Sequence, residues 1–144
     1  MTLVIDASVA LSALTTGGPV GRWAEEQLVS SRDLVAPHHF HLEVTNVLRR
    51  AQLAGQLDAT AASLAFHDLR RLPVRVIPFD PLAERIWALR DNLTSYDAAY
   101  VAAAEALDAP LATLDKRLVQ SPGPTCTFRY PCLLYTSPSP RDRG

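Results

Sequence analysis

Short apolar runs alternate along the chain with longer segments in which apolar residues recur every three or four positions. The short runs are typical of buried strands, and the recurring positions are typical of helices with one apolar face. The pattern predicts strands at 3–5, 34–36, 74–79, 110–115 and 125–130, and helices at 7–14, 20–30, 38–54, 57–72, 81–92, 94–107 and 116–120. Such alternation predicts an α/β fold, a three-layer α/β/α sandwich on a mainly parallel sheet of four to five strands.

Length and charge limit what kind of protein this is. The chain has 144 residues, of which 48% are hydrophobic and 20% charged, and no repeat or linker divides it. This size suits one domain with one core. The formal net charge of −1 excludes a global basic field, so a polyanion must be bound locally.

Nothing in the sequence indicates a membrane or a secretory route. The longest apolar runs fall far short of the roughly 20 residues that span a bilayer. Residues 1–6 lack the basic start of a secretory signal. Cys126 and Cys132 fit neither a zinc-ligand spacing nor a disulfide framework. We therefore expect a cytoplasmic protein without a membrane partner.

The last residues have a different origin from the rest. The eleven residues that begin at Cys132, Cys-Leu-Leu-Tyr-Thr-Ser-Pro-Ser-Pro-Arg-Asp, match the translation of a transposase-type sequencing-library adapter. Segments of this kind are excluded from fold reasoning. We expect residues 1–131 to form the functional domain and residues 132–144 to be disordered adapter read-through.

Four acidic residues stand out because of their positions. Asp6 ends the first predicted strand and Asp115 ends the fourth, while Glu43 and Asp97 lie on helices. The carboxyl ends of parallel strands meet at one edge of the sheet, where ligands bind. We therefore expect all four carboxylates to face that edge.

Each acid also has a purely structural explanation. Asp6 and Asp115 can cap the helices that follow them, Thr94 with Asp97 matches a capping box, and Glu43 can be a solvated helix residue. Together, however, four converging carboxylates repel one another unless a cation neutralises them. Oxygen ligands alone suit Mg²⁺, with Mn²⁺ as a substitute. Such an ion activates water and stabilises charge in phosphoryl displacement.

Four ordered blocks carry a family resemblance. They are Val4–Ser8, Glu43–Arg50, Tyr96–Glu105 and Leu111–Leu118. In order and spacing they resemble the PIN-domain ribonucleases, and more narrowly the VapC-type toxins of type II toxin–antitoxin systems. The blocks extend from Val4 to Leu118, which is nearly the whole chain apart from its end.

The resemblance implies a metal-dependent endoribonuclease that hydrolyses RNA phosphodiester bonds and acts as a toxin. It implies a homodimer that is inhibited by a cognate VapB-like antitoxin. It also implies that Mg²⁺ or Mn²⁺ is held by Asp6, Glu43, Asp97 and Asp115, with Asn46 and Thr113 as supporting polar residues. Arg50 and Lys116 each neighbour one of these acids, so both are candidates for RNA contact.

Other chemistry remains open at this point. Asp6 could be the nucleophile of an aspartyl-phosphate hydrolase or the acceptor of a receiver domain, although Ser8 stands where such a hydrolase has a second Asp. The chain could also be a non-catalytic module that only binds a partner. Tyr96 and Tyr100 could stack an unpaired base or support the alanine-rich helix from inside.

Overall fold

The computed structural model describes residues 1–132, so all but the first residue of the suspected adapter segment lies outside the described residues. Strands and helices alternate in the order that the sequence predicts. The strands are β1 (Thr2–Ile5), β2 (Asp33–Pro37), β3 (Val74–Ile77), β4 (Leu111–Ala112) and β5 (Phe128–Arg129). The helices are α1 (Ala7–Thr15), α2 (Gly18–Ser30), α3 (Phe40–Leu53), α4 (Ala59–Arg71), α5 (Ala83–Ala88), α6 (Ser95–Ala106) and α7 (Lys116–Gln120), with a 3₁₀ turn η1 (Asp80–Leu82) before α5.

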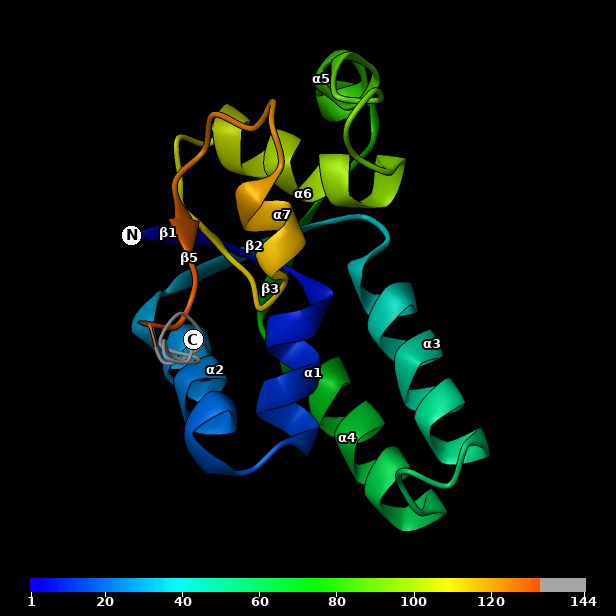
Figure 1. Cartoon of the computed structure of the whole chain (residues 1–144). Helices are drawn as coiled ribbons and strands as arrows, with labels where there is room; N and C mark the ends of the chain where they lie inside the picture. The colour runs from blue at the N-terminus through cyan, green and yellow to red at the C-terminus, as the bar shows by residue number, and fades with distance from the viewer. Residues whose placement is uncertain (133–144) are drawn as a thin grey trace, which may run out of the picture.

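The strands form a five-stranded sheet in the order β3-β2-β1-β4-β5, and every neighbouring pair is parallel. Helices α1–α4 lie on one side of the sheet, and η1, α5 and α6 lie on the other (Figure 1). The predicted three-layer α/β/α sandwich is therefore confirmed. Strand order reverses between β1 and β4, and this is where parallel sheets of this kind bind ligands.

Small residues bring one helix close to the centre of the sheet. Helix α6 is buried from Ala98 to Ala104, and it packs against β1, β2 and β4. Five of these seven residues are alanines, so the helix axis can approach the strands closely. Strand β1 is equally enclosed, with Leu3, Val4 and Ile5 fully buried. The carboxyl end of β1, which Asp6 follows, and the start of α6, where Asp97 lies, are thus fixed relative to each other.

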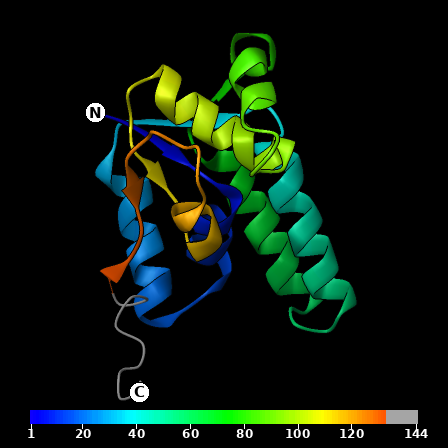
Figure 2. The ribbon, with the colours of Figure 1, turned by 45° about the horizontal axis from the view of Figure 1, so that its top comes forward.

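Helices α3 and α4 form an antiparallel pair that extends well beyond the sheet (Figure 2). Only one face of each helix is buried, and on α3 that face includes Phe40, Val44 and Leu48. None of the helices in residues 1–132 combines the length and apolarity that crossing a membrane requires.

Several predicted elements are shorter than expected, among them the strands predicted over 74–79 and 125–130, which span Val74–Ile77 and Phe128–Arg129. The helix predicted over 81–92 ends at Ala88, where the Arg90 guanidinium donates to the Trp87 carbonyl at 2.8 Å. The strand predicted over 110–115 ends at Ala112. Beyond it, the Leu114 and Asp115 backbone amides donate to side-chain hydroxyls instead of a neighbouring strand. The chain therefore leaves the sheet before it reaches Asp115.

Gly21 allows α2 to pack against the end of α1. A methyl group at this position would lie 1.9 Å from the backbone oxygen of Thr16, whereas at Gly17 it would meet nothing within 4 Å. We predict that Gly21→Ala lowers the free energy of unfolding by about 2 kcal/mol or more, because rigid backbone must move. Gly17→Ala is the matched control, and equal losses in chemical denaturation of the two variants would contradict the assignment.

Candidate active site

Two of the four predicted acids lie just beyond the carboxyl ends of β1 and β4. Asp6 follows β1, and Asp115 lies three residues beyond β4. Both residues cap helices, since Asp6 accepts a hydrogen bond from the Val9 amide and Asp115 accepts one from the Arg117 amide. The capping explanation is therefore correct for both residues, and it is compatible with a place at the reversal of strand order.

Asp6 is a buried carboxylate surrounded by hydroxyl donors. Asp6 is only 7% exposed to solvent. One carboxylate oxygen accepts from the Ser8 hydroxyl at 2.5 Å and the Val9 amide at 3.2 Å, and the other accepts from the Thr113 hydroxyl. Burial raises the pKa of Asp6 to about 6, the charge of Glu43 adds to this, and the donated hydrogen bonds oppose it.

Two hydroxyls join the segments that follow β1 and β4. The Thr113 hydroxyl, which donates to Asp6, also accepts from the Asp115 amide at 3.0 Å. The Ser8 hydroxyl donates to Asp6 and accepts from the Leu114 amide at 3.0 Å. Thr113 thus lies where a supporting residue was predicted. The role of Ser8 was not predicted, and its place two residues after Asp6 is the only sequence signal for it.

Glu43 projects from the first turn of α3 and is half-exposed. The buried Tyr100 hydroxyl donates to its Oε1 at 2.8 Å, and Nε2 of His39 lies 3.4 Å from the same oxygen, outside hydrogen-bond alignment. Burial acts to raise the pKa of Glu43, but His39 and Tyr100 together lower it below its usual value. Tyr100 is therefore buried support for an acid, a contact that its sequence position does not reveal.

Asp97 and Asp115 face each other across the starts of α6 and α7. Asp97 is half-buried, and its pKa is raised by burial and then by the charges of Asp115 and Glu43. Arg117 lies near Asp115, with 3.7 Å between Nε and Oδ1, but its side chain is 94% exposed. The negative charges of Glu43 and Asp115 therefore both act on Asp97.

Two adjoining cavities open beside these acids. One of about 630 Å³ lies between α3 and the start of α6, and one of about 310 Å³ lies between the start of α6 and α7. Thr94 and Asp97 line both, so the cavities meet at Asp97.

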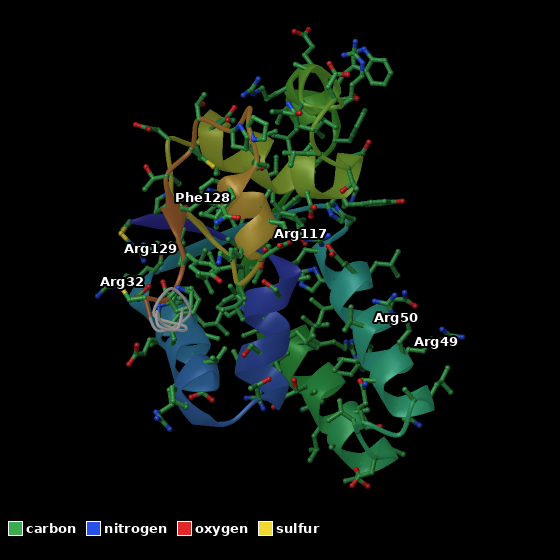
Figure 3. All side chains as sticks on the ribbon, in the orientation of Figure 1. Arg32, Arg49, Arg50, Arg117, Phe128 and Arg129 are labelled. Carbon is green, nitrogen blue, oxygen red and sulfur yellow. The ribbon has the colours of Figure 1, made fainter. Side chains whose placement is uncertain are left out.

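Some of the polar residues expected beside the acids line the cavities, and others do not. Asn46 and Arg50 line the larger cavity, as predicted for residues near the acids. Lys116 is exposed and lines neither, whereas Arg117 lines the smaller one. Figure 3 shows Arg117 beside α7 and Arg50 on α3.

The acidic centre fits a hard cation by its chemistry. Its charged ligands are carboxylate oxygens, which Mg²⁺ and Mn²⁺ accept. Burial is the main cause of the raised pKa values of Asp6 and Asp97, and neighbouring carboxylates add to it, so a cation beside them would favour their charged forms. Within residues 1–132, however, no three side chains of Asp, Glu, His or Cys are gathered tightly enough to hold an ion together. The four carboxylates are therefore chemically suitable ligands and lie near one another, but they are not drawn together around one ion position.

Comparison with known proteins identifies the family. The PIN-domain family model matches residues 3–123. Ribonuclease VapC9 of Mycobacterium tuberculosis is 42% identical over 116 residues, which cover 81% of this chain and 87% of VapC9. The chain therefore belongs to the PIN-domain family, and its relatives include VapC ribonucleases.

Solved structures show the same fold. PAE2754 from Pyrobaculum aerophilum has a TM-score of 0.69 at 22% identity, covering 93% of this chain and 86% of that one. A toxin–antitoxin complex from Klebsiella pneumoniae contains a chain with a TM-score of 0.53 at 22% identity, covering 82% of this chain and 90% of its own.

The buried charge of Asp6 makes stability depend on pH. Its pKa is about 6 in the folded protein, against 3.8 for an unperturbed aspartate, so protonation of Asp6 favours the fold fully below pH 3.8, and this benefit is lost as pH rises through 6. We predict that Asp6→Asn stabilises the metal-free protein by about 2–3 kcal/mol above pH 6, and that this advantage disappears below about pH 4. Thermal unfolding in chelator across this range measures the difference, and a pH-independent difference would contradict the prediction.

Removing the Tyr100 hydroxyl isolates its effect on Glu43. We predict that Tyr100→Phe raises the pKa of Glu43, because a hydrogen bond to the charged form is lost. Mn²⁺ affinity is expected to fall about tenfold, as for other partners of metal ligands. Carboxyl NMR and calorimetric titration measure the two effects. Tyr96→Phe is the matched control, and the same change in both variants would refute the assignment.

Proposed function

We propose that this chain is a metal-dependent endoribonuclease that acts as the toxin of a VapBC-type pair. Support comes from its PIN-domain membership, its 42% identity to a VapC ribonuclease, and the four carboxylates at the reversal of strand order. The observation that carries the proposal is geometric: Glu43, Asp97 and Asp115 line two adjoining cavities, and the Thr113 hydroxyl bonds both the Asp6 carboxylate and the Asp115 amide. Uncompensated carboxylates would repel a phosphodiester, so the proposal requires a bound cation.

Asp6, Glu43, Asp97 and Asp115 would hold this ion, and Mg²⁺ or Mn²⁺ suits their oxygens. When bound, the ion supplies positive charge against the phosphate and makes water a stronger nucleophile. Hydrolysis would join the oxygen of one water to phosphorus and break the bond to one ribose oxygen, which would leave with a proton from that water. Ser8 and Thr113 keep Asp6 in one orientation, and Tyr100 does the same for Glu43. The chain thus contributes oriented carboxylates, in keeping with preorganised electrostatic catalysis.

The geometry at Asp6 argues against the aspartyl-phosphate alternative. Such a hydrolase has a second Asp two residues after the nucleophile, whereas this chain has Ser8 there, with its hydroxyl donating to Asp6. A receiver domain would also need a lysine at this edge, and among residues 1–132 the only lysine, Lys116, is exposed outside both cavities. A purely partner-binding module would have no need of four neighbouring acids.

Arg50 and Arg117 are the proposed contacts for RNA phosphates. They line the two cavities on opposite sides of Asp97, so a strand that follows both cavities passes the acids. A VapB-like antitoxin is the proposed protein partner, supported by the fold shared with a chain of a toxin–antitoxin complex. A homodimer remains part of the proposal, on the strength of the family resemblance alone.

RNA cleavage tests the proposal directly. We predict that the full chain cleaves single-stranded RNA from a mixed pool with Mg²⁺ or Mn²⁺ and not with chelator. Asp6→Asn and Asp97→Asn are expected to lower the rate by at least about 100-fold, because charge stabilisation at the phosphate is lost. Asp68→Asn, an exposed change on α4, is the matched control.

The outcomes separate the candidate functions. Full cleavage by either site variant, with native circular dichroism, would refute the metal mechanism. Covalent labelling of Asp6 by a phosphate donor would instead favour the aspartyl-phosphate hydrolase.

A further inference from the structure

Tyr96 is an exposed aromatic residue beside the acidic centre. It lies in the first turn of α6, next to Asp97, and it is 66% exposed while lining the larger cavity. Leu42, which is 74% exposed, lines the same cavity. Apolar surface left open at a concave site marks a place where a ligand binds.

The Tyr96 ring is supported from below. The His39 ring packs against it at a centroid distance of 5.5 Å, and the buried Tyr100 ring packs edge-on against His39 at 5.1 Å. A row of three rings therefore runs from the interior to the cavity. Its outermost ring is positioned by aromatic contacts that leave it largely uncovered.

Polar groups in the same cavity lack protein partners. Within residues 1–132, the side chains of Asn46 and Arg50 make no hydrogen bond or ion pair with another protein group. An amide such as that of Asn46 both donates and accepts, as a base edge requires, and a guanidinium binds phosphate. The cavity thus combines an aromatic surface, a two-way hydrogen-bonding group and a cation.

We propose that this cavity binds one unpaired nucleobase of the RNA, adjacent to the phosphodiester that is cleaved. The base stacks on Tyr96, and its edge bonds the Asn46 amide while Arg50 holds a neighbouring phosphate. This inference rests on the proposed endoribonuclease function and adds a substrate-recognition site to it.

The position of the acids favours a base over other occupants. Glu43 and Asp97 line the cavity, so an uncompensated anionic group is repelled there, whereas a nucleobase is neutral. A cavity of about 630 Å³ is of the size that holds small ligands. Aromatic stacking and edge recognition are the general means by which proteins bind single-stranded RNA.

Abasic substitution tests the stack. A single-stranded RNA that the wild-type protein cuts at one bond is prepared with one abasic ribose at each position near that bond. We expect one such position to lower kcat/KM of the wild type about tenfold, within the range for loss of one stacked base. On intact RNA, Tyr96→Ala should lower kcat/KM by a similar factor. On that abasic RNA, Tyr96→Ala should lower kcat/KM by less than about twofold relative to the wild type, since the stacking interaction is already absent.

Matched variants define the result. Tyr96→Phe keeps the ring and should lose clearly less cleavage than Tyr96→Ala on the same intact RNA. Trp87→Ala removes an exposed aromatic residue on α5, outside the cavity, and should leave all rates unchanged. Asn46→Ala should alter the preference among bases at the same position, which a purely structural role would not do.

Several results would overturn the inference. Equal losses for Tyr96→Ala on intact and abasic RNAs at every position would show that Tyr96 contacts no base. Unchanged cleavage with weakened inhibition by a co-expressed antitoxin would assign the ring to a protein partner instead. If the wild type cleaves no RNA, the proposed function fails and this site fails with it, whereas failure of the Tyr96 comparison alone leaves the function intact.

Discussion

The hydrogen bonds to the buried carboxylate of Asp6 are the constraint on which the site depends. Ser8 and Thr113 donate to its two oxygens and at the same time accept backbone amides of the segment after β4. The two strands on either side of the reversal in strand order are thereby joined through one charged group. A buried carboxylate is retained when its charge is stabilised by such donors, and here the donors also fix where Asp115 lies.

The same arrangement makes the metal-free site electrostatically unfavourable. Burial and neighbouring negative charge raise the pKa values of Asp6 and Asp97, which means that their ionised forms cost free energy. Active sites commonly carry such a cost, and the remainder of the fold must offset it. In this protein the elements next to the site, the enclosed strand β1 and the alanine-rich face of α6, bury apolar surface that stabilises the fold and offsets this cost.

The sequence predicted the order of elements and the parallel sheet, because both depend on local periodicity; that the four acids share one metal ion stays a prediction. It did not predict the contact of Tyr100 with Glu43, since residues 57 positions apart meet only through packing. Lys116 was chosen over Arg117 because it follows Asp115 directly. In α7 Arg117 lines the smaller cavity although its side chain is 94% exposed; Lys116 is exposed as well, and its contact with RNA stays a prediction. The predicted read-through segment lies outside the described residues from 133 onward and stays a prediction.

The Thr113 to Asp6 hydrogen bond joins residues 107 positions apart. A ribosome that has synthesised β1 through α6 has therefore made three of the four acids but neither the threonine nor the aspartate that completes their arrangement. The centre can assemble only after β4 has left the exit tunnel, late in translation of the domain. A nascent or prematurely terminated chain would consequently lack the assembled site until nearly the whole domain has been made.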